Sequence, residues 1–192
     1  MLYLNQLDYR HIHYEHNVSN GGVPQERRNI ATSGCGICCA CMMVEQLTTH
    51  QLSIEECVRI NYAAGANLQI GTRMGALGPA LADKFNLKFE VTKDVDAMLR
   101  CLQTGGRVII LVGGDREGYT GVYSHVGHFI LAISYDGENL CILDPSYKDG
   151  KYQEEGRVGK VQVNYPFTYC KPEYIVEDSL NRDTPFFLFW RK

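Results

Sequence analysis

The feature that most constrains the fold is the stretch from Ser33 to Val44, which reads SGCGICCACMMV. After its first cysteine nearly every residue is small or apolar, so the segment predicts a buried helix around which the rest of the chain is organised. We expect this helix to begin at Cys35 or Gly36 and to run to about Thr48, because Val44 and Leu47 continue its apolar face.

Cys35 stands at the start of this predicted helix, between Gly34 and Gly36. A thiol at a helix N-terminus lies near the positive end of the helix dipole and near unpaired backbone N–H groups, which lower the pKa of the thiol. The two glycines allow a sharp turn and leave the approach to the sulfur open for an acyl group. The stretch alone is equally compatible with a buried cysteine that has no chemical role.

The remaining pattern predicts helices first and strands afterwards. Three further helices are expected: one from a capping box at Ser53 to about Ala64, one over 73–85 interrupted by Gly75, Gly78 and Pro79, and one over Val95–Gln103 capped by Asp94. After Gly106, short apolar runs predict strands at 108–112, 129–133 and 140–143, with more at 161–163 and 186–190. This order indicates an α+β architecture with segregated lobes.

Length and composition favour one domain. The chain has 192 residues, 45% of them hydrophobic and 21% charged, and no Pro- or Ser-rich linker divides it. We therefore expect a single domain over residues 1–192, made of an N-terminal arm (1–32), a helical lobe (33–105) and a sheet lobe (106–192).

Charge and cysteine usage narrow the function classes. With 19 basic and 22 acidic residues the net charge is −3, which disfavours nucleic acid and anionic membranes as partners. No segment approaches a membrane span or resembles a signal peptide, so the chain as written is expected to be cytoplasmic, although a removed signal peptide would leave the same sequence. The eight cysteines are expected to be reduced thiols, because four of them crowd one helix. The oligomeric state is left open.

A thiol nucleophile needs a base, and histidine serves best near neutral pH. His128 begins one predicted strand and Asp144 ends the next. A hairpin with a three- or five-residue loop around Asp136 would place His128 and Asp144 directly opposite each other, with Cβ atoms about 4.5–5.5 Å apart. The carboxylate could then accept the imidazole N–H and fix its orientation. Together with Cys35 this predicts a nucleophile, a base and an orienting acid, with His125 as an alternative base.

Four short motifs extend this pattern: Asn5-Gln6, Ser33-Gly34-Cys35-Gly36, Gly127-His128-Phe129-Ile130 and Asp144-Pro145. In these motifs and their order, most of the chain resembles papain-like cysteine peptidases of the bacteriocin-leader-processing type, family thirty-nine, especially the stand-alone bacterial relatives. The resemblance implies a papain-like cysteine proteinase fold, with an N-terminal helical lobe packed on a C-terminal antiparallel β-sheet lobe. It also implies Cys35 as nucleophile, His128 as general base and acid, Asp144 as orienting residue and Gln6 as oxyanion donor.

The assignment of Gln6 rests on the resemblance, and Gln25 or Asn29 could occupy the oxyanion hole instead. The sequence also departs from the family pattern. Where a proline and small residues commonly follow the glycine after the nucleophile, this chain has Ile37-Cys38-Cys39. The departure is compatible with a helix but could reshape the pocket beside the sulfur.

The function expected from these observations is a thiol hydrolase that cleaves a peptide or protein substrate through an acyl-enzyme, without cofactor or metal. Acyl transfer would share that intermediate. Two alternatives are a catalytically silent peptide-binding module of the same fold and a zinc-binding protein. The zinc protein would use Cys35, Cys38 and Cys39, which are spaced to converge on one side of a helix, together with His125 or His128. The N-terminal arm contains three closely spaced histidines, His11, His13 and His16, which are expected to lie on the surface.

Overall fold

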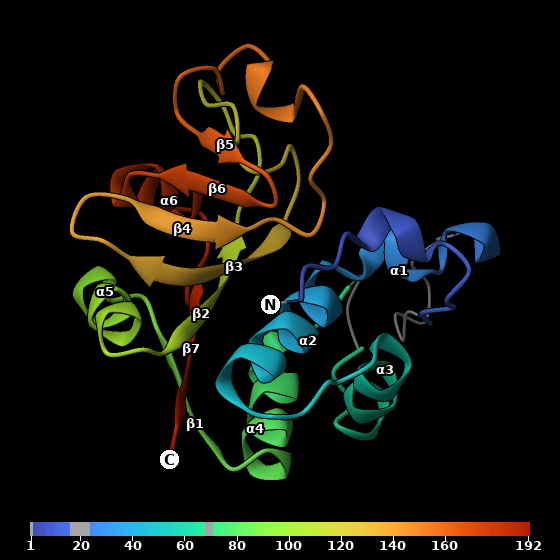
Figure 1. Ribbon diagram of the computed structural model, residues 1–192. Helices are drawn as coiled ribbons and strands as arrows, with labels where there is room; N and C mark the ends of the chain where they lie inside the picture. The colour runs from blue at the N-terminus through green and yellow to red at the C-terminus, as the bar shows by residue number, and fades with distance from the viewer. Residues whose placement is uncertain (1, 16–23, 68–70) are drawn as a thin grey trace.

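The computed structural model describes residues 2–15, 24–67 and 71–192. One antiparallel sheet is covered by helices on both faces (Figure 1). The helices are α1 (Ile30–Ser33), α2 (Cys35–Leu47), α3 (Ile54–Ala63), α4 (Met74–Lys84), α5 (Val95–Gln103) and α6 (Pro172–Asp178), with the 3-10 helices η1 (Gln6–Tyr9), η2 (Gln25–Arg27) and η3 (Lys151–Gln153). The strands are β1 (Leu87–Thr92), β2 (Arg107–Val112), β3 (His128–Tyr135), β4 (Leu140–Leu143), β5 (Gln162–Asn164), β6 (Phe167–Cys170) and β7 (Phe186–Arg191).

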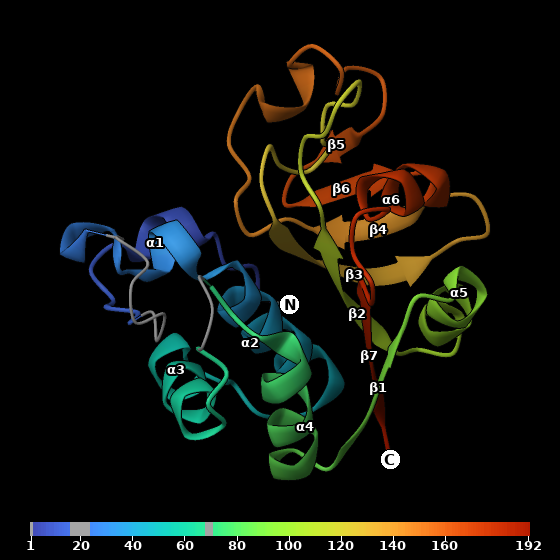
Figure 2. The same ribbon diagram turned by 180° about the vertical axis from the view of Figure 1, so that it is seen from behind.

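The sheet has seven strands in the order β1-β7-β2-β3-β4-β6-β5, and every neighbouring pair is antiparallel. Successive side chains of its central strands point into two different hydrophobic cores, because neighbouring residues of a strand face opposite sides of the sheet. Ile109 and Leu131 pack with the helices α2 to α4, whereas Ile110 and Ile130 pack with α5 and α6. Figure 2 shows α5 and α6 on the face of the sheet opposite to α2.

Helix α2 lies at the centre of the first core, as its sequence predicted. Ten of its residues are buried, from Gly36 through Leu47, because it contacts the sheet at β2 and β3 and contacts α3 beside it. The helix begins at Cys35 and ends at Leu47, so both predicted ends are confirmed to within one residue. The N-terminus of this buried helix is thereby held against the start of β3.

The other predicted helices are present, with one correction. The Ser53 hydroxyl accepts the Glu56 N–H at the start of α3, and the Asp94 carboxylate accepts two backbone N–H groups at the start of α5, so both caps are confirmed. The expected interruption over 73–85 is wrong, because α4 continues through Pro79. A proline inside a helix removes one backbone hydrogen bond, and its ring crowds the carbonyl four residues earlier. Here the burial of Leu77 and Leu81 in the first core offsets that cost.

Among the strands and the longer helices, the sequence did not predict β1, β6 and α6, and it also gave no sign of the short helix α1 or of the 3-10 helices. Strand β1 lies within the range assigned to the helical lobe, yet it forms one edge of the sheet by pairing with the C-terminal strand β7. Its burial is largely one-sided and its charged residues face solvent, so it lacks the continuous apolar run by which the other strands were found. In the described residues of the N-terminal arm, one isolated antiparallel bridge joins His13 and Asn29.

Within the described part of the chain, no helix has both the length and the apolar character needed to cross a membrane.

Candidate active site

Cys35 is the first residue of α2 and is half-buried. The sequence suggested that Gly34 and Gly36 allow a sharp turn, but the structure gives them another role. Gly34 has an ordinary negative φ of −93°, and a Cβ atom there would lie only 2.5 Å from Cγ2 of Ile30. A Cβ atom at Gly36 would lie 2.8 Å from Cβ of Thr72. The glycines are therefore required by close packing around the start of the helix.

His128 is the first residue of β3, and Asp144 directly follows β4. Nε2 of His128 lies 2.8 Å from Oδ1 of Asp144, and both side chains are buried. The residues therefore meet as the sequence predicted, but not through the predicted register. Leu131 pairs with Leu143, so Asp144 lies diagonally from His128 on the same face rather than directly opposite.

Two local features change the register of this hairpin. The loop between Tyr135 and Leu140 has four residues, not three or five, and the Asp136 carboxylate closes it by accepting the N–H groups of Glu138 and Asn139. An irregularity between Ala132 and Ser134 then shifts the pairing again. The net offset is two residues, which preserves the face on which Asp144 lies.

Asp144 accepts hydrogen bonds on both carboxylate oxygens. Oδ1 accepts from His128 and from the Ser146 N–H at 2.9 Å. Oδ2 accepts from Nζ of Lys151 at 2.5 Å and from the Tyr152 hydroxyl at 2.6 Å. Burial raises the pKa of this carboxyl, but Lys151 and His128 outweigh burial and hold the pKa well below its usual range. Asp144 is therefore a buried carboxylate fixed from several sides.

The thiol and the imidazole shift each other's pKa. Burial raises the pKa of Cys35, but a hydrogen bond to His128, the charge of His128 and backbone hydrogen bonds from Phe129 and Gly36 lower it below its ordinary value. Burial lowers the pKa of His128, but its hydrogen bonds to Asp144 and Cys35 raise it above the ordinary value. Because Asp144 occupies Nε2, the ring nitrogen left for the thiol is Nδ1. The site therefore favours a thiolate beside an imidazolium.

Gln6 joins the two segments that carry these residues. Its backbone N–H donates to the carbonyl of Pro145 at 2.7 Å, and its side-chain Nε2 donates to the carbonyl of Ala31 at 2.9 Å, one helical turn before Cys35. Gln6 is 6% exposed, and its Oε1 atom is buried without a hydrogen-bond partner among the described residues. The N-terminal arm thus lies between the Asp144-Pro145 turn and the start of the buried helix.

The residues considered as an alternative base (His125) and as alternative oxyanion donors (Gln25 and Asn29) lie elsewhere in the structure. His125 is exposed, and its ring nitrogens contact Asp115 and Glu154, each at 2.9 Å. Asn29 caps α1 by accepting the Thr32 N–H, and Gln25 is exposed in η2. These contacts leave His128 as the histidine that meets the thiol.

The neighbouring thiols are part of the core. All eight cysteines are free, and Cys38, Cys39 and Cys41 are fully buried. Burial raises the pKa of Cys38 and Cys39 well above the ordinary value. Among the described residues no group of three metal-ligating side chains is arranged to hold a metal ion. Of the three histidines in the N-terminal arm, His13 contacts the carboxylate of Glu15 at 2.7 Å, and His16 lies outside the described residues.

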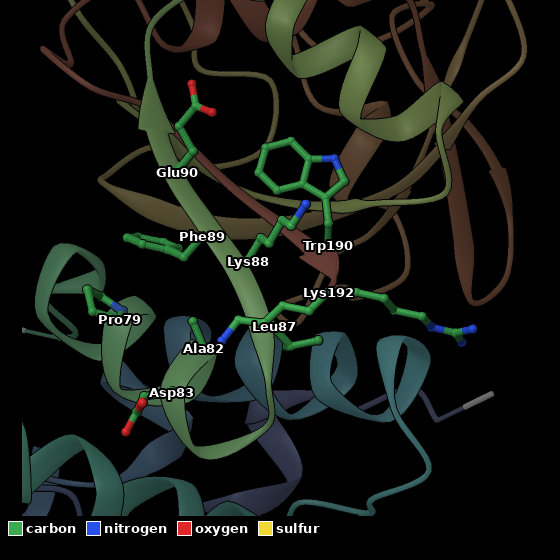
Figure 3. Close-up of a pocket in the computed structure, with 10 residues that line it drawn as sticks. Pro79, Ala82, Asp83, Leu87, Lys88, Phe89, Glu90, Trp190 and Lys192 are labelled. Carbon is green, nitrogen blue, oxygen red and sulfur yellow. The ribbon is translucent and has the colours of Figure 1, made fainter.

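A large hollow lies away from this site. It has a volume of about 810 Å³ and is lined by α4, the edge strand β1 and the end of β7, where Lys88, Glu90 and Trp190 surround it (Figure 3). The described residues that line it include no cysteine or histidine, and therefore no thiol nucleophile with its base. The candidate site is therefore defined by the side chains around Cys35 rather than by this cavity.

Sequence reasoning missed three side chains at the site: Ser146, Lys151 and Tyr152. Ser146 had a local signal, because an aspartate commonly accepts the N–H of the residue two positions on. Lys151 and Tyr152 had none, since they return to Asp144 only through the turn at Gly150, which has a left-handed φ of 78°.

Comparison with known proteins gave a structural likeness only. No family model and no curated protein matched the sequence. Among solved structures, the chain is similar to one described as a "putative C39-like peptidase" from Bacillus anthracis, with a TM-score of 0.56 and 12% sequence identity over 83% of this chain and 90% of that chain. The protein therefore has the α+β, papain-like fold of C39-like peptidases, as the sequence predicted.

Proposed function

We propose that this protein is a cysteine peptidase in which Cys35 is the nucleophile, His128 the general base and acid, and Asp144 the residue that orients the imidazole. The observation that carries the proposal is the His128–Asp144 pair beside the thiol. Nε2 of His128 lies 2.8 Å from Oδ1 of Asp144, and the interaction between thiol and imidazole lowers the pKa of Cys35 and raises the pKa of His128. The fold shared with a C39-like peptidase supports the same reaction class.

The reaction follows from these roles. The Cys35 thiolate attacks the carbonyl carbon of a peptide bond, and the carbonyl oxygen takes the negative charge. His128 then gives its proton to the leaving amine, which produces a thioester between Cys35 and the acyl part. For release, His128 takes a proton from a water molecule, the resulting hydroxide attacks the thioester carbon, and the thiolate leaves. Asp144 stabilises the imidazolium that forms in each half of the cycle.

The proposed substrate is a peptide or protein, and the proposed enzyme is a single domain. The two cores on opposite faces of a single sheet support residues 1–192 as one peptidase domain. The expected cleft lies at the N-terminus of α2, where β3 and the N-terminal arm meet it.

The first test measures thiol reactivity and hydrolysis together. Iodoacetamide should label Cys35 rapidly at pH 6, at least about tenfold faster than an ordinary thiol, because the thiolate is stabilised there. The same protein should cleave members of a random peptide library. Mass spectrometry of the labelled protein identifies the modified cysteine.

The matched variants are His128→Ala and His125→Ala. His128→Ala should remove both the fast labelling and the hydrolysis, whereas His125→Ala should retain both, because the exposed His125 ring contacts the carboxylates of Asp115 and Glu154 instead of the thiol. Slow, uniform labelling of all eight thiols in the wild type would refute the proposal. Fast labelling without cleavage of any peptide would instead favour a silent binding module.

Gln6 is proposed as the side-chain donor to the oxyanion. Gln6→Ala should lower kcat by about 10²–10³-fold with little change in KM, because an oxyanion donor acts only in the transition state. Gln25→Ala is the control, since this exposed glutamine lies in η2 and should leave kcat unchanged. The assignment of Gln6 fails when folded Gln6→Ala, verified by circular dichroism, hydrolyses the same peptides at the wild-type rate.

A further inference from the structure

A buried cation lies on the far side of Asp144 from His128. Lys151 is 4% exposed, and its Nζ donates to Asp144 Oδ2 at 2.5 Å and to Ser146 Oγ at 2.8 Å. A buried ammonium is costly unless it is paired, and its partner here is the carboxylate that also accepts from His128. One carboxylate therefore serves two cationic groups, one on each oxygen.

The four groups form an alternating series of charges. In the active form proposed above, the Cys35 thiolate is negative, the His128 imidazolium positive, the Asp144 carboxylate negative and the Lys151 ammonium positive. Their sum is zero. Without Lys151 the same site would carry one net negative charge in a buried position, where charge interactions are strong.

The other titratable groups around the cluster do not replace Lys151. The ionisable side chains that face Asp144 are Tyr3, Cys39, Tyr123 and Tyr152, and burial raises the pKa of each of them. They are therefore neutral near neutral pH. Arg157 donates to the backbone carbonyl of Lys151 at 3.4 Å, but its charge is paired with Glu154 at 2.8 Å.

We propose that Lys151 is a positioning residue that neutralises Asp144, so that the pair orients His128 as a neutral hydrogen-bond acceptor would. The proposal rests on the function proposed for Cys35 and His128. A lone buried carboxylate would hold the imidazolium proton strongly and oppose its transfer to the leaving amine. The ammonium of Lys151 reduces that hold and leaves the geometry of the hydrogen bond intact.

The test follows the rate of Cys35 alkylation by iodoacetamide from pH 5 to pH 10. The upper inflection of this profile reports loss of the imidazolium proton beside the thiolate. Lys151→Met should move it up by about one pH unit, because removal of a nearby cation makes that proton harder to remove. Asp144→Asn should move it down, because Lys151 then acts on the imidazole without its counter-ion. The double variant should return to within a few tenths of a unit of the wild type.

A purely structural lysine would not give shifts of opposite sign that cancel. The control is Lys148→Met, which removes an exposed cation three residues away and should leave the profile unchanged. Circular dichroism verifies the fold of each variant, and where Lys151→Met does not fold, the double variant decides. A profile of Lys151→Met identical to the wild type, or a double variant without the wild-type inflection, overturns the proposal.

The two proposals fail in different ways. Slow alkylation of wild-type Cys35 overturns both. Rapid alkylation with the expected shifts, but without hydrolysis of any peptide, overturns the peptidase and supports the role of Lys151. If Cys35 is alkylated rapidly and peptides are hydrolysed, but Lys151→Met changes neither rate nor pH profile, the peptidase proposal stands and the role of Lys151 is overturned.

Discussion

Cys35→Ala is expected to abolish peptide hydrolysis, with a loss of about 10⁵-fold or more in kcat, because the acyl-enzyme forms on the Cys35 thiolate. The fold should persist. Cys35 is half-buried at the helix start, and alanine is smaller and favourable in a helix. The measurement is turnover of a cleavable library peptide, together with circular dichroism and the midpoint of urea unfolding.

The matched control is Cys38→Ala, one turn along the same helix. Cys38 is fully buried, and burial raises the pKa of its thiol, so it contributes packing and no thiolate. Cys38→Ala should therefore cost about 1 kcal/mol of stability, through lost contacts in the core, and keep hydrolysis within a few-fold of the wild type. The prediction is contradicted when Cys35→Ala retains turnover, or when Cys38→Ala loses it while folded.

The elements that carry the candidate site were predictable because their signals are local. The apolar run after Cys35 indicates a buried helix wherever it stands in the chain, and His128 and Asp144 flank two short apolar strands. Because side chains alternate between the two faces of a strand, His128 and Asp144 still lie on the same face of the sheet, even though the predicted register was wrong by two residues. A register depends on a bulge and on loop closure by Asp136, and neither has a clear local signal.

The parts that were missed depend on long-range packing. Strand β1 exists because β7, about a hundred residues later, offers it a partner along its whole length. Lys151 becomes a buried cation only because the chain turns back at Gly150 and meets a carboxylate already committed to His128. In sequence, a lysine between a glycine and a tyrosine resembles any solvated surface residue. Gln6 was found through the resemblance, and its bonds to Pro145 and Ala31 supply a physical reason for its position.

Asp144→Ala is expected to lower the free energy of unfolding by about 3–5 kcal/mol at pH 7. The variant leaves the Lys151 ammonium buried without its counter-ion, and it removes the acceptor for His128 and for the Ser146 N–H. Breaking a buried ion pair from one side costs far more than removing both partners. Urea unfolding at equilibrium gives the free energy, and the Asp144→Ala/Lys151→Met double variant should recover a large part of the loss.

The pH dependence of this loss follows from the pKa of Asp144, which is held well below its usual range in the folded protein. A carboxyl with a depressed folded pKa contributes stability above its unfolded pKa of about 4, and that contribution disappears as the pH falls through the folded value. The difference between wild type and Asp144→Ala should therefore be complete at pH 6–7 and shrink progressively below about pH 4. A difference under 1 kcal/mol at pH 7, or one that grows on acidification, would show that the Asp144–Lys151 pair does not stabilise the folded state.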